Sequence, residues 1–499
     1  MRERLRLRAF LFKNSSFLKA VPRATWFAGS HIASPGLLHC PHTGAVSHNK
    51  SCRAKGSLQP RIKLSHRHNL YGMAWPDRFG VQFGQQPNYE STAGERQRRG
   101  ENTVTTATQV SEMTTNAAPT GNLEITVSRA ELLRELTAAQ SVVERKTTIP
   151  ILSNFLFEAT QDEGGDRLTI TATDLDQSLK TSCSARVKKP GACTIPARKL
   201  YDYIKLLPEG EISIKLMDNH WVQIRAGRSN TKMVGMARAN FPQVPEFPSA
   251  GAVKLPVAAL KNMVSKTIFA ISNEESRYTL NGALLVLKAE SMAMVATDGH
   301  RLAHIEKMGE QLEGIQGEKK TLIPRKALGE LSGLLSNTDS DAIEFADDDQ
   351  TLFFRVGGRV LTSRKLTGQF PNYEAVLPRD NNKFVIVRSE DLMSAIQRVA
   401  QFADERSGAI KIRLEQNELK LSSSSTDAGE SEDSIETPYN YDPLVVGFNS
   451  QYLLDFLKAI GNTGEVRLEF KDAQSAGQMR PEDGNEDVKY RYILMPMRI

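Results

Sequence analysis

The chain repeats itself three times from Leu123 onward, with a period of about 128 residues. Each copy opens with a short β-rich run that leads into an amphipathic helical pattern. These openings are LEITVSRAELLRELTAAQSVV from residue 123, VKLPVAALKNMVSKTIFA from 253 and FVIVRSEDLMSAIQRVAQFA from 384. A copy of about 125 residues is long enough to bury a full core of its own. We therefore expect three similar domains.

A second strand and helix are predicted midway through each copy, in CTIPARKLYDYIKLLP, TLIPRKALGELSGLL and VVGFNSQYLLDFLKAI. Pro196, Pro324 and Asn449 hold equivalent places in these segments. Segments such as DRLTITATD and EVRLEF lie between the helices, and their alternation with a period of two is typical of half-buried strands. Each copy thus reads as two β-α-β-β-β units, an α+β fold with its helices on one face of antiparallel sheets.

Two proline-rich segments separate the copies, FPQVPEFPSAG at 241–251 and FPNYEAVLPRDNN at 370–382. Proline enforces extended, non-helical backbone, so both segments are predicted to be domain linkers. The predicted domains cover residues 123–246, 252–378 and 382–499.

Residues 1–122 precede the repeats and are predicted to be a disordered basic extension. Residues 1–112 hold 17 Lys and Arg against 6 Asp and Glu, a balance of +11, and this leaves residues 113–499 at −5 of the total of +6. Three origins stay open. The first stretch has the composition of an organelle transit peptide, the start can lie upstream of a true initiator at Met113, or the segment is a basic arm that touches DNA phosphates.

The composition also excludes several classes of protein. No run approaches the roughly 20 apolar residues of a membrane helix. The four cysteines, Cys40, Cys52, Cys183 and Cys193, contain no CxxC pair, and we expect no zinc site, no other metal and no cofactor. No phosphate-binding GxxxxGK[ST] loop, HExxH or GxSxG is present.

The densest polar cluster of the repeats is VATDGHRLAHIE, which allows two interpretations. Asp298 and His300 can be an acid–base pair of a nucleic-acid enzyme, although no nucleophile or metal partner is recognisable beside them. Alternatively, Asp298-Gly299 is a tight turn between two strands, because Asp-Gly suits positive φ.

Basic side chains recur on the predicted helices, although the repeats as a whole are acidic. If all helices face one side, these residues form a positive lining that meets DNA phosphates without reading bases. The alternative is that Lys and Arg are simply good, solvated helix formers. The residues are Arg129, Arg134, Lys199, Lys205, Lys261, Lys266, Lys326, Arg388, Arg398 and Lys458.

The repeat and its motifs resemble the bacterial beta sliding clamp, the beta subunit of DNA polymerase III, over residues 123–499. The resemblance rests on TIPILSNFLFEA (148–159), LTITATDLDQSL (168–179), IPARKLYDYIKLLPEG (195–210), SRYTLNGALL (276–285), ATDGHRLA (296–303), IPRKALGEL (323–331), GQFPNYEAVLP (368–378) and YILMPMRI (492–499). It implies three domains per chain and a ring of two chains joined head to tail, with helices lining the hole.

The resemblance also implies a non-catalytic, cytoplasmic processivity factor that encircles duplex DNA without sequence preference. Its implied partners are a second copy, the clamp loader, the polymerase alpha subunit and other proteins whose short peptide enters a hydrophobic pocket between the second and third domains.

The resemblance assigns site residues position by position. The implied peptide pocket consists of Leu280, Thr297, Gly299, His300, Arg301, Leu302, Pro324, Leu328, Ile493, Met495, Pro496, Met497 and Arg498. The implied DNA contacts are Lys146, Arg228, Arg277 and Tyr278. Two positions depart from the family pattern, since Gln369 stands where a basic residue is common and Thr279 where a second aromatic is frequent.

Two other functions remain alternatives to the clamp. A nucleic-acid enzyme that uses Asp298 and His300 predicts that His300→Ala abolishes turnover. A repeat scaffold that does not bind DNA predicts a monomer in solution.

Overall fold

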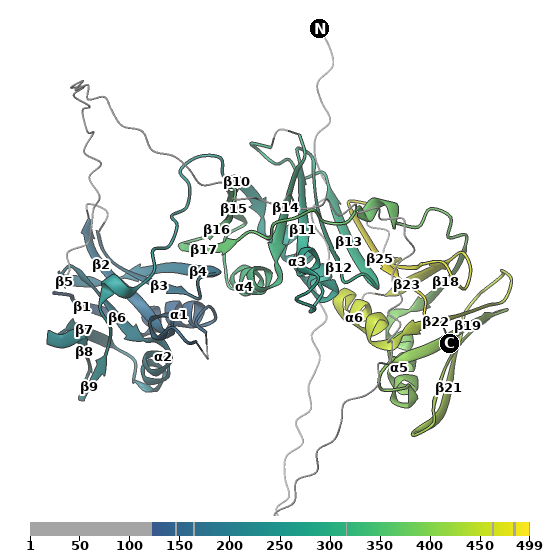
Figure 1. The fold of residues 1–499 in the computed structure, drawn as a ribbon, viewed down its shortest axis with the longest axis horizontal. Coiled ribbons are helices and arrows are strands. Elements are labelled where there is room, and N and C mark those ends of the chain that lie inside the picture. The colour runs from purple at the N-terminus through teal and green to yellow at the C-terminus, as the bar shows by residue number, and fades with distance from the viewer. Residues whose placement is uncertain are drawn as a thin grey trace, which may run out of the picture. The chain divides into compact units, whose positions relative to one another are not determined.

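The computed structural model describes residues 122–144, 147–162, 165–315, 317–461, 464–482 and 486–498. The predicted N-terminal extension, up to residue 121, lies outside the described residues. The described part runs through the same order of strands and helices three times (Figure 1).

Domain 1 consists of β1 (Glu124–Ser128), α1 (Arg129–Gln140), β2 (Asn154–Asp162), β3 (Gly165–Thr173), β4 (Gln177–Ser184), β5 (Arg186–Lys189), β6 (Gly191–Pro196), α2 (Ala197–Leu206), β7 (Glu211–Leu216), β8 (Trp221–Ala226) and β9 (Ser229–Val234). Domain 2 consists of β10 (Val253–Pro256), α3 (Val257–Thr267), β11 (Gly282–Lys288), β12 (Ser291–Thr297), β13 (Arg301–Met308), β14 (Lys319–Pro324), α4 (Arg325–Ser336), β15 (Ala342–Asp347), β16 (Thr351–Val356) and β17 (Arg359–Arg364).

Domain 3 consists of β18 (Lys383–Arg388), α5 (Ser389–Val399), β19 (Ala409–Glu415), β20 (Glu418–Ser425), β21 (Gly429–Glu436), β22 (Leu444–Asn449), α6 (Ser450–Ile460), β23 (Glu465–Phe470), β24 (Gly477–Pro481) and β25 (Val488–Leu494). The predicted pair of β-α-β-β-β units is confirmed in all three domains, and β5 is an additional strand in domain 1.

Each helix follows its strand without a loop. Pro196 and Pro324 stand directly before α2 and α4, where their fixed φ, −56° and −59°, lets the strand pass into the helix. Asn449 holds the same place before α6, and its side-chain oxygen accepts a hydrogen bond from the backbone N–H of Tyr452 at 3.2 Å. The three equivalent positions of the sequence repeat are therefore equivalent helix starts.

The strands form four antiparallel sheets, and two of these cross from one domain into the next. One sheet runs β10-β15-β16-β17-β4-β3-β2-β6, with β17 of domain 2 paired to β4 of domain 1. Another runs β14-β11-β12-β13-β25-β24-β23-β18, with β25 of domain 3 paired to β13 of domain 2. The other two sheets, β5-β1-β7-β8-β9 and β21-β20-β19-β22, belong to domains 1 and 3 alone. Each joint between domains is thus a continuous hydrogen-bonded sheet.

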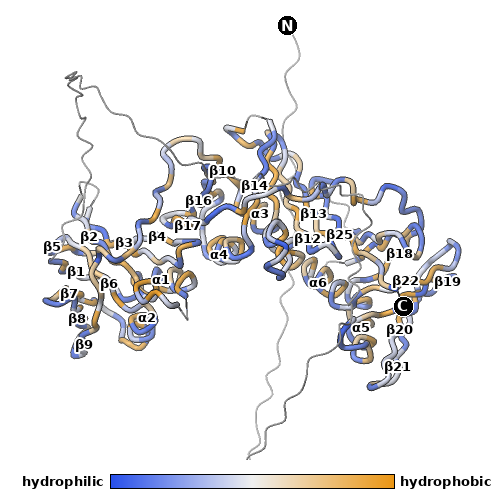
Figure 2. Tube along the Cα trace, in the orientation of Figure 1, coloured by the Kyte–Doolittle hydropathy of each residue, from blue (hydrophilic) through white to orange (hydrophobic). Residues whose placement is uncertain are grey.

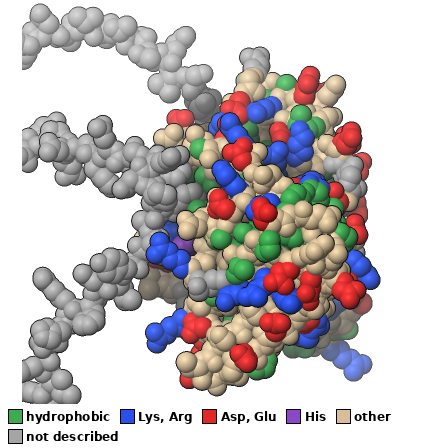
Figure 3. Space-filling view, turned by 90° about the vertical axis from the view of Figure 1, so that its right-hand side faces the viewer, with side chains coloured by type: hydrophobic (Ala, Val, Ile, Leu, Met, Phe, Trp, Pro, Cys, Tyr) green, Lys and Arg blue, Asp and Glu red, His purple; other side chains and the backbone are tan. Residues whose placement is uncertain are grey.

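The two helices of each domain pack against each other and against its sheets. Their apolar faces are buried with those of the strands, and Phe157, Phe345 and Phe456 are completely enclosed in the three domains. Hydrophobic residues accordingly concentrate in the strands and helices, while the connecting loops are hydrophilic (Figure 2). On the face drawn in Figure 3, acidic and basic side chains are interspersed around smaller hydrophobic areas. No helix in the described ranges is long and apolar enough to span a membrane.

Both linkers cover the outer surface of a sheet. Phe241 of the first linker is buried against Ile151 and Leu156 of domain 1. Phe370 of the second linker packs against the apolar outer residues of the sheet in domain 2. The FP sequence that opens each linker therefore has the same role in both.

Candidate functional site

The turn between β12 and β13 is held by its own side chains. The Thr297 hydroxyl donates to the carbonyl of Arg301 at 2.6 Å and accepts from the Gly299 N–H at 3.1 Å. One oxygen of Asp298 accepts from the backbone N–H groups of His300 and Arg301 at 2.9 and 3.0 Å. Gly299 has φ of +91°, so the predicted Asp-Gly turn is confirmed. The turn is rigid and leaves the His300 side chain exposed.

The Arg301 side chain lies below this turn and is 9% exposed. Its guanidinium forms ion pairs with Asp298 at 3.0 Å and with Asp455 of α6 at 2.6 Å. It also donates to the carbonyl of Phe269 at 2.6 Å and lies over the ring of Tyr452, 4.3 Å from the centroid. Arg301 therefore links domain 2 to domain 3.

The last residues of the chain run beside this turn. Ile493 of β25 pairs with Leu302 of β13, and the Met495 N–H donates to the His300 carbonyl at 2.9 Å. Two residues later the Met497 N–H donates to the carbonyl of Gly447 at 2.8 Å and so adds to the edge of β22. Met495, Pro496 and Met497 are half-buried, and Arg498 is exposed. The C-terminal segment thus forms a second wall, contributed by domain 3, next to Thr297–Leu302 of domain 2.

Leu280 joins this group through the short helical turn Tyr278–Leu280. The neighbouring Arg277 donates to the Asp298 carbonyl at 2.6 Å, which fixes this segment against the β12–β13 turn. Eleven of the thirteen pocket residues implied by the resemblance therefore come from segments that touch one another.

The other two, Pro324 and Leu328, lie at the end of β14 and at the start of α4. Pro324 pairs with Gly282 of β11, two residues after Leu280, and the next residue, Arg325, donates its N–H to the Asn281 carbonyl at 2.9 Å. Leu328 points into the core of domain 2 and is 0% exposed. The assignment of both residues to the pocket therefore stays a prediction.

The second linker adds apolar residues beside the candidate site that the motifs alone do not place there. Phe370, Tyr373 and Leu377 pack against the same apolar outer surface as Leu302 and Ile493. The sequence contains them in GQFPNYEAVLP, which we interpret above as a linker and as a motif of the resemblance but not as part of the site.

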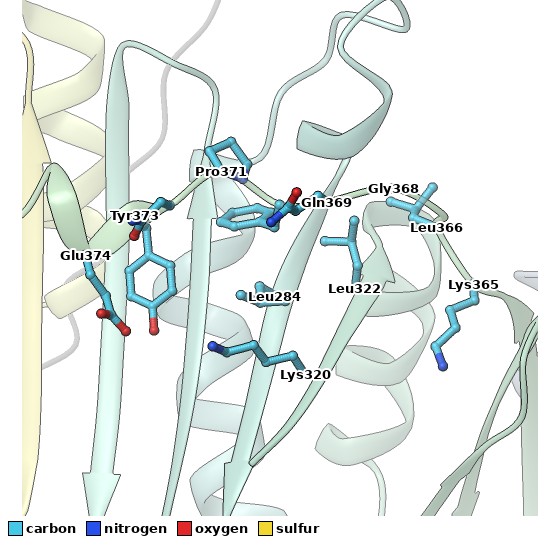
Figure 4. Close-up of a pocket in the computed structure, with 12 residues that line it drawn as sticks. Leu284, Lys320, Leu322, Lys365, Leu366, Gly368, Gln369, Pro371, Tyr373 and Glu374 are labelled. Carbon is cyan, nitrogen blue, oxygen red and sulfur yellow. The ribbon is translucent and has the colours of Figure 1, made fainter. Parts of the chain in front are cut away.

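Beside this surface the linker encloses a cavity of about 580 Å³. Figure 4 shows Leu284 and Leu322 of β11 and β14 below the linker residues Gln369 and Pro371. Lys320 and Glu374 add opposite charges to its rim.

Comparison with known proteins gives the family of the chain. Models of the DNA polymerase III beta subunit match three consecutive stretches, the N-terminal domain over 123–245, the central domain over 254–372 and the C-terminal domain over 374–498. The beta sliding clamp of Caulobacter vibrioides is 34% identical over 383 residues, which are 76% of this chain and 100% of the relative. That of Pseudomonas aeruginosa is 32% identical over 378 residues, with the same shares.

The chain belongs to the DNA polymerase III beta subunit family, the beta sliding clamps.

Solved structures of the family agree with the fold. The sliding clamp from Bartonella birtlesii bound to griselimycin superposes with a TM-score of 0.71 at 35% identity, over 76% of this chain and 100% of that one. The sliding clamp from Pseudomonas aeruginosa bound to griselimycin gives 0.70 at 33% identity, with the same coverage.

The function of this chain is that of its family, a non-catalytic processivity clamp. The enzyme alternative is not supported by the geometry of its two residues. Both carboxylate oxygens of Asp298 are engaged, one by the backbone of the turn and the other by Arg301, and the contact to His300 is to its backbone. Asp298 shapes the sliding clamp's turn and forms no acid–base pair with the His300 ring.

The residues implied for DNA contact lie in different places. Lys146 lies outside the described residues. Arg228 is exposed in the turn between β8 and β9, at the edge of a sheet. Arg277 pairs with Glu274 at 2.8 Å, while the neighbouring Tyr278 is 51% exposed.

The two positions that depart from the family pattern, Thr279 and Gln369, lie close together in the structure. Gly368 has φ of +112°, and the Thr279 methyl group lies only 2.7 Å from where a Cβ on Gly368 would stand. Thr279 therefore packs directly beside the residue that precedes Gln369. A side chain at position 368 would therefore collide with Thr279.

The basic residues predicted on the helices divide into two groups. The first group contacts other residues of the protein, through ion pairs for Arg134, Lys326, Arg388 and Arg398 and through the Tyr490 ring for Lys266. Arg129 is held by Glu209 and by the carbonyls of Ile204 and Lys205, so it serves the packing of α1 on α2. The second group is exposed, and none of its members forms an ion pair with another described residue. It consists of Lys199, Lys205, Lys261 and Lys458.

Proposed function

We propose that two copies of this chain close head to tail into a ring around duplex DNA, in the cytoplasm, and hold replication proteins at the β12–β13 turn. The main support for the ring is that equivalent strands pair at both joints between domains. The last strand of domain 2, β17, pairs with β4 of domain 1, and the last strand of domain 3, β25, pairs with the equivalent β13 of domain 2.

The same equivalence leaves two strands without their expected partner. β9 ends domain 1 as β17 ends domain 2, and β21 of domain 3 corresponds to β4 and β13. Within the described part of the chain, β9 and β21 each have a neighbour on one side only. An unpaired edge is a template for another strand, and a second copy offers both missing partners. Two head-to-tail contacts of this kind make a closed ring of six domains.

Charge supports this pairing of edges. Glu430, Glu432 and Glu436 are exposed along β21, while Arg228 and Lys232 are exposed along β9 and its turn. Opposite charges on two edges steer them together and disfavour the pairing of like edges.

Duplex DNA is supported as the ligand of the helices. Lysines on α2, α3 and α6 present charge that requires no particular base sequence, and phosphate contacts of this kind carry no sequence information. A clamp that slides needs such contacts, because recognition of one sequence would stop it.

The groove between the β12–β13 turn and the C-terminal segment is supported as the site for short peptides of partner proteins. Met495 and Met497 are half-buried there, next to the buried apolar residues Leu302 and Ile493, and methionine adapts to ligands of different shape. We include the clamp loader and the polymerase alpha subunit among these partners.

Mass in solution together with retention on DNA tests the ring. We expect the full chain to be a dimer that, once loaded by a clamp loader, stays on circular plasmid and leaves linearised plasmid of the same sequence. Linear plasmid with both ends blocked by bound protein is the matched control, and retention should return. A monomer, or equal retention on open linear and circular DNA, would contradict the proposal.

A further inference from the structure

The side chain of Arg301 contacts three elements of two domains. In domain 2 it binds Asp298 of the turn and the Phe269 carbonyl after α3, and in domain 3 it binds Asp455 and stacks on Tyr452 of α6. These partners surround the guanidinium almost completely. The resemblance assigned Arg301 to the peptide pocket, but its charged group is occupied by protein contacts.

The backbone of Arg301, by contrast, belongs to the groove wall. Its N–H and carbonyl are held by Asp298 and Thr297, and the next residue, Leu302, faces the outer apolar surface. The preceding His300 carbonyl holds Met495 of the opposite wall. The backbone of Arg301 therefore lies along the groove, and its side chain extends into the joint between domains 2 and 3.

The equivalent turn of domain 1 lacks this arrangement. Gln177 holds the place of Arg301 in domain 1, and its side-chain nitrogen and oxygen are buried without a hydrogen-bond partner among the described residues. The first joint is instead held by Lys326 of α4, which pairs with Asp174 of the turn. At the joint between domains 1 and 2 the helix thus supplies the cation and the turn the acid. At the joint between domains 2 and 3 the turn supplies the cation, Arg301, and the helix supplies the acid, Asp455.

We propose that Arg301 is a positioning residue, which fixes α6 and the C-terminal segment against the β12–β13 turn so that the two groove walls keep a binding-competent spacing. Its guanidinium does not touch the bound peptide. The proposal rests on the proposed peptide groove. Arginine suits this task because its rigid planar fork holds two carboxylates and a carbonyl while its face stacks on Tyr452, whereas the lysine ammonium has no planar face to stack.

Loss of a positioning residue has a distinct kinetic result. When only a fraction of molecules holds the competent groove, the apparent affinity and the association rate fall by that fraction. Loss of a direct contact instead acts mainly on dissociation. The two roles are therefore separable by rates as well as by affinity.

The test measures association and dissociation of griselimycin, which two solved relatives hold bound, on the full-length dimer. We expect Arg301→Lys and Asp455→Asn each to weaken binding about tenfold, mostly through slower association, and the double variant to weaken it no further. Glu330→Gln changes the equivalent position of α4 at the other joint and should leave binding unchanged. Dimer mass and melting temperature confirm that each variant is folded.

Three results overturn the proposal. If Arg301→Lys weakens binding and Asp455→Asn does not, Arg301 contacts the ligand directly. If neither variant has an effect while His300→Ala and Met497→Ala weaken binding, the groove stands and the positioning role fails. If those two groove variants also leave binding unchanged, the proposed groove itself is wrong, and the positioning role falls with it.

Discussion

Lys326 of domain 2 forms an ion pair with Asp174 in the β3–β4 turn of domain 1, where the Asp174 side chain is only 1% exposed. The sequence repeat places an equivalent pair at the proposed ring joint. Arg198 stands two residues after Pro196 as Lys326 stands two after Pro324, and Asp427 follows a threonine at the end of β20 as Asp174 does at the end of β3. Both residues are exposed in the single chain.

We expect Arg198→Glu to weaken the dimer at least tenfold, because it would set like charges against the partner's acidic turn. Asp427→Arg should weaken it similarly, and the double charge reversal should restore it in part. Sedimentation at several concentrations measures the dissociation constant. Full dimerisation of both single variants would show that the proposed ring joint has no ion pair equivalent to the one between Lys326 and Asp174.

A second ionic contact at the first joint is buried. Glu135 of α1 accepts from Arg359 of β17 at 2.8 and 3.1 Å and also binds Thr181. Burial alone raises the pKa of the Glu135 carboxyl, but the hydrogen bonds from Arg359, Thr181 and Arg134 outweigh burial and hold the pKa below its usual 4.5. The stability from this carboxylate is therefore fully present above about pH 4.5 and is lost as the pH falls through the lower folded pKa.

Glu135→Gln should destabilise the protein by about 3 kcal/mol at pH 7, because it leaves the Arg359 charge buried without its partner. The variant should also lose less stability than the wild type between pH 5 and pH 3. Urea unfolding followed by circular dichroism measures both effects. Lys180→Gln removes an exposed pair with Glu246 at 3.0 Å and serves as the control, with an expected change below about 0.5 kcal/mol. Equal effects of the two substitutions would contradict the role of burial.

Much of this architecture was predictable from the sequence, because the same order of strand and helix patterns occurs in three copies. The helix starts at Pro196, Pro324 and Asn449 and the Asp298-Gly299 turn follow from local rules of backbone geometry. The predicted domain boundaries remain predictions, although each lies between the last strand of one domain and the first of the next.

The site was less predictable, because proximity between distant segments is set by sheet order. Nothing local to Leu328 distinguishes a core leucine from a pocket leucine, and only the folded chain shows that its side chain is completely buried. Likewise, the charge of Arg301 suggests a surface residue until Asp455, 154 residues later, is placed beside it.

The C-terminal wall of the groove can be removed without touching β25. A chain that ends at Leu494 keeps the pairing of β25 with β13 but loses the hydrogen bonds of Met495 and Met497. We expect this truncation to weaken griselimycin binding at least tenfold while dimer mass and retention on circular DNA stay unchanged. Lys489→Ala, which changes one exposed residue of β25 outside the site, is the control and should have little effect. Unchanged binding by the truncated chain would remove this segment from the site.

The exposed helix lysines predict the salt dependence of DNA binding. Each phosphate contact releases counterions, so its loss lowers the slope of log affinity against log salt by about 1. We expect Lys261→Gln and Lys458→Gln each to lower the slope by about this amount, with no change between DNA sequences. Arg388→Gln is the control, since Arg388 is paired within 4 Å with Glu390 and Asp391. Fluorescence anisotropy on short duplexes over a salt series gives the slopes, and an unchanged slope would exclude the lysine concerned from DNA contact.

His304 of β13 lies under the second linker, where its ring stacks on Tyr373 with 5.6 Å between centroids. Burial, assisted by Arg491 and Lys288, lowers the pKa of His304 to about 4 from the usual 6.5. The folded protein thus holds the neutral ring, whereas the unfolded chain takes up a proton below pH 6.5. The unfolded chain therefore binds more protons than the folded protein in this range. The free energy of unfolding falls as the pH drops from 6.5 to about 4, and this contribution is constant below that.

The loss over this range is about 3 kcal/mol, since one pKa unit corresponds to about 1.4 kcal/mol. His304→Phe keeps an aromatic ring against Tyr373 and removes the titration, so its stability should change less between pH 6.5 and pH 4 than that of the wild type. Urea unfolding at half-unit pH steps checks this, with His220→Phe at an exposed position as the control. Parallel pH profiles for wild type and His304→Phe would mean that the ring is already protonated in the folded protein, and that the linker tolerates the charge.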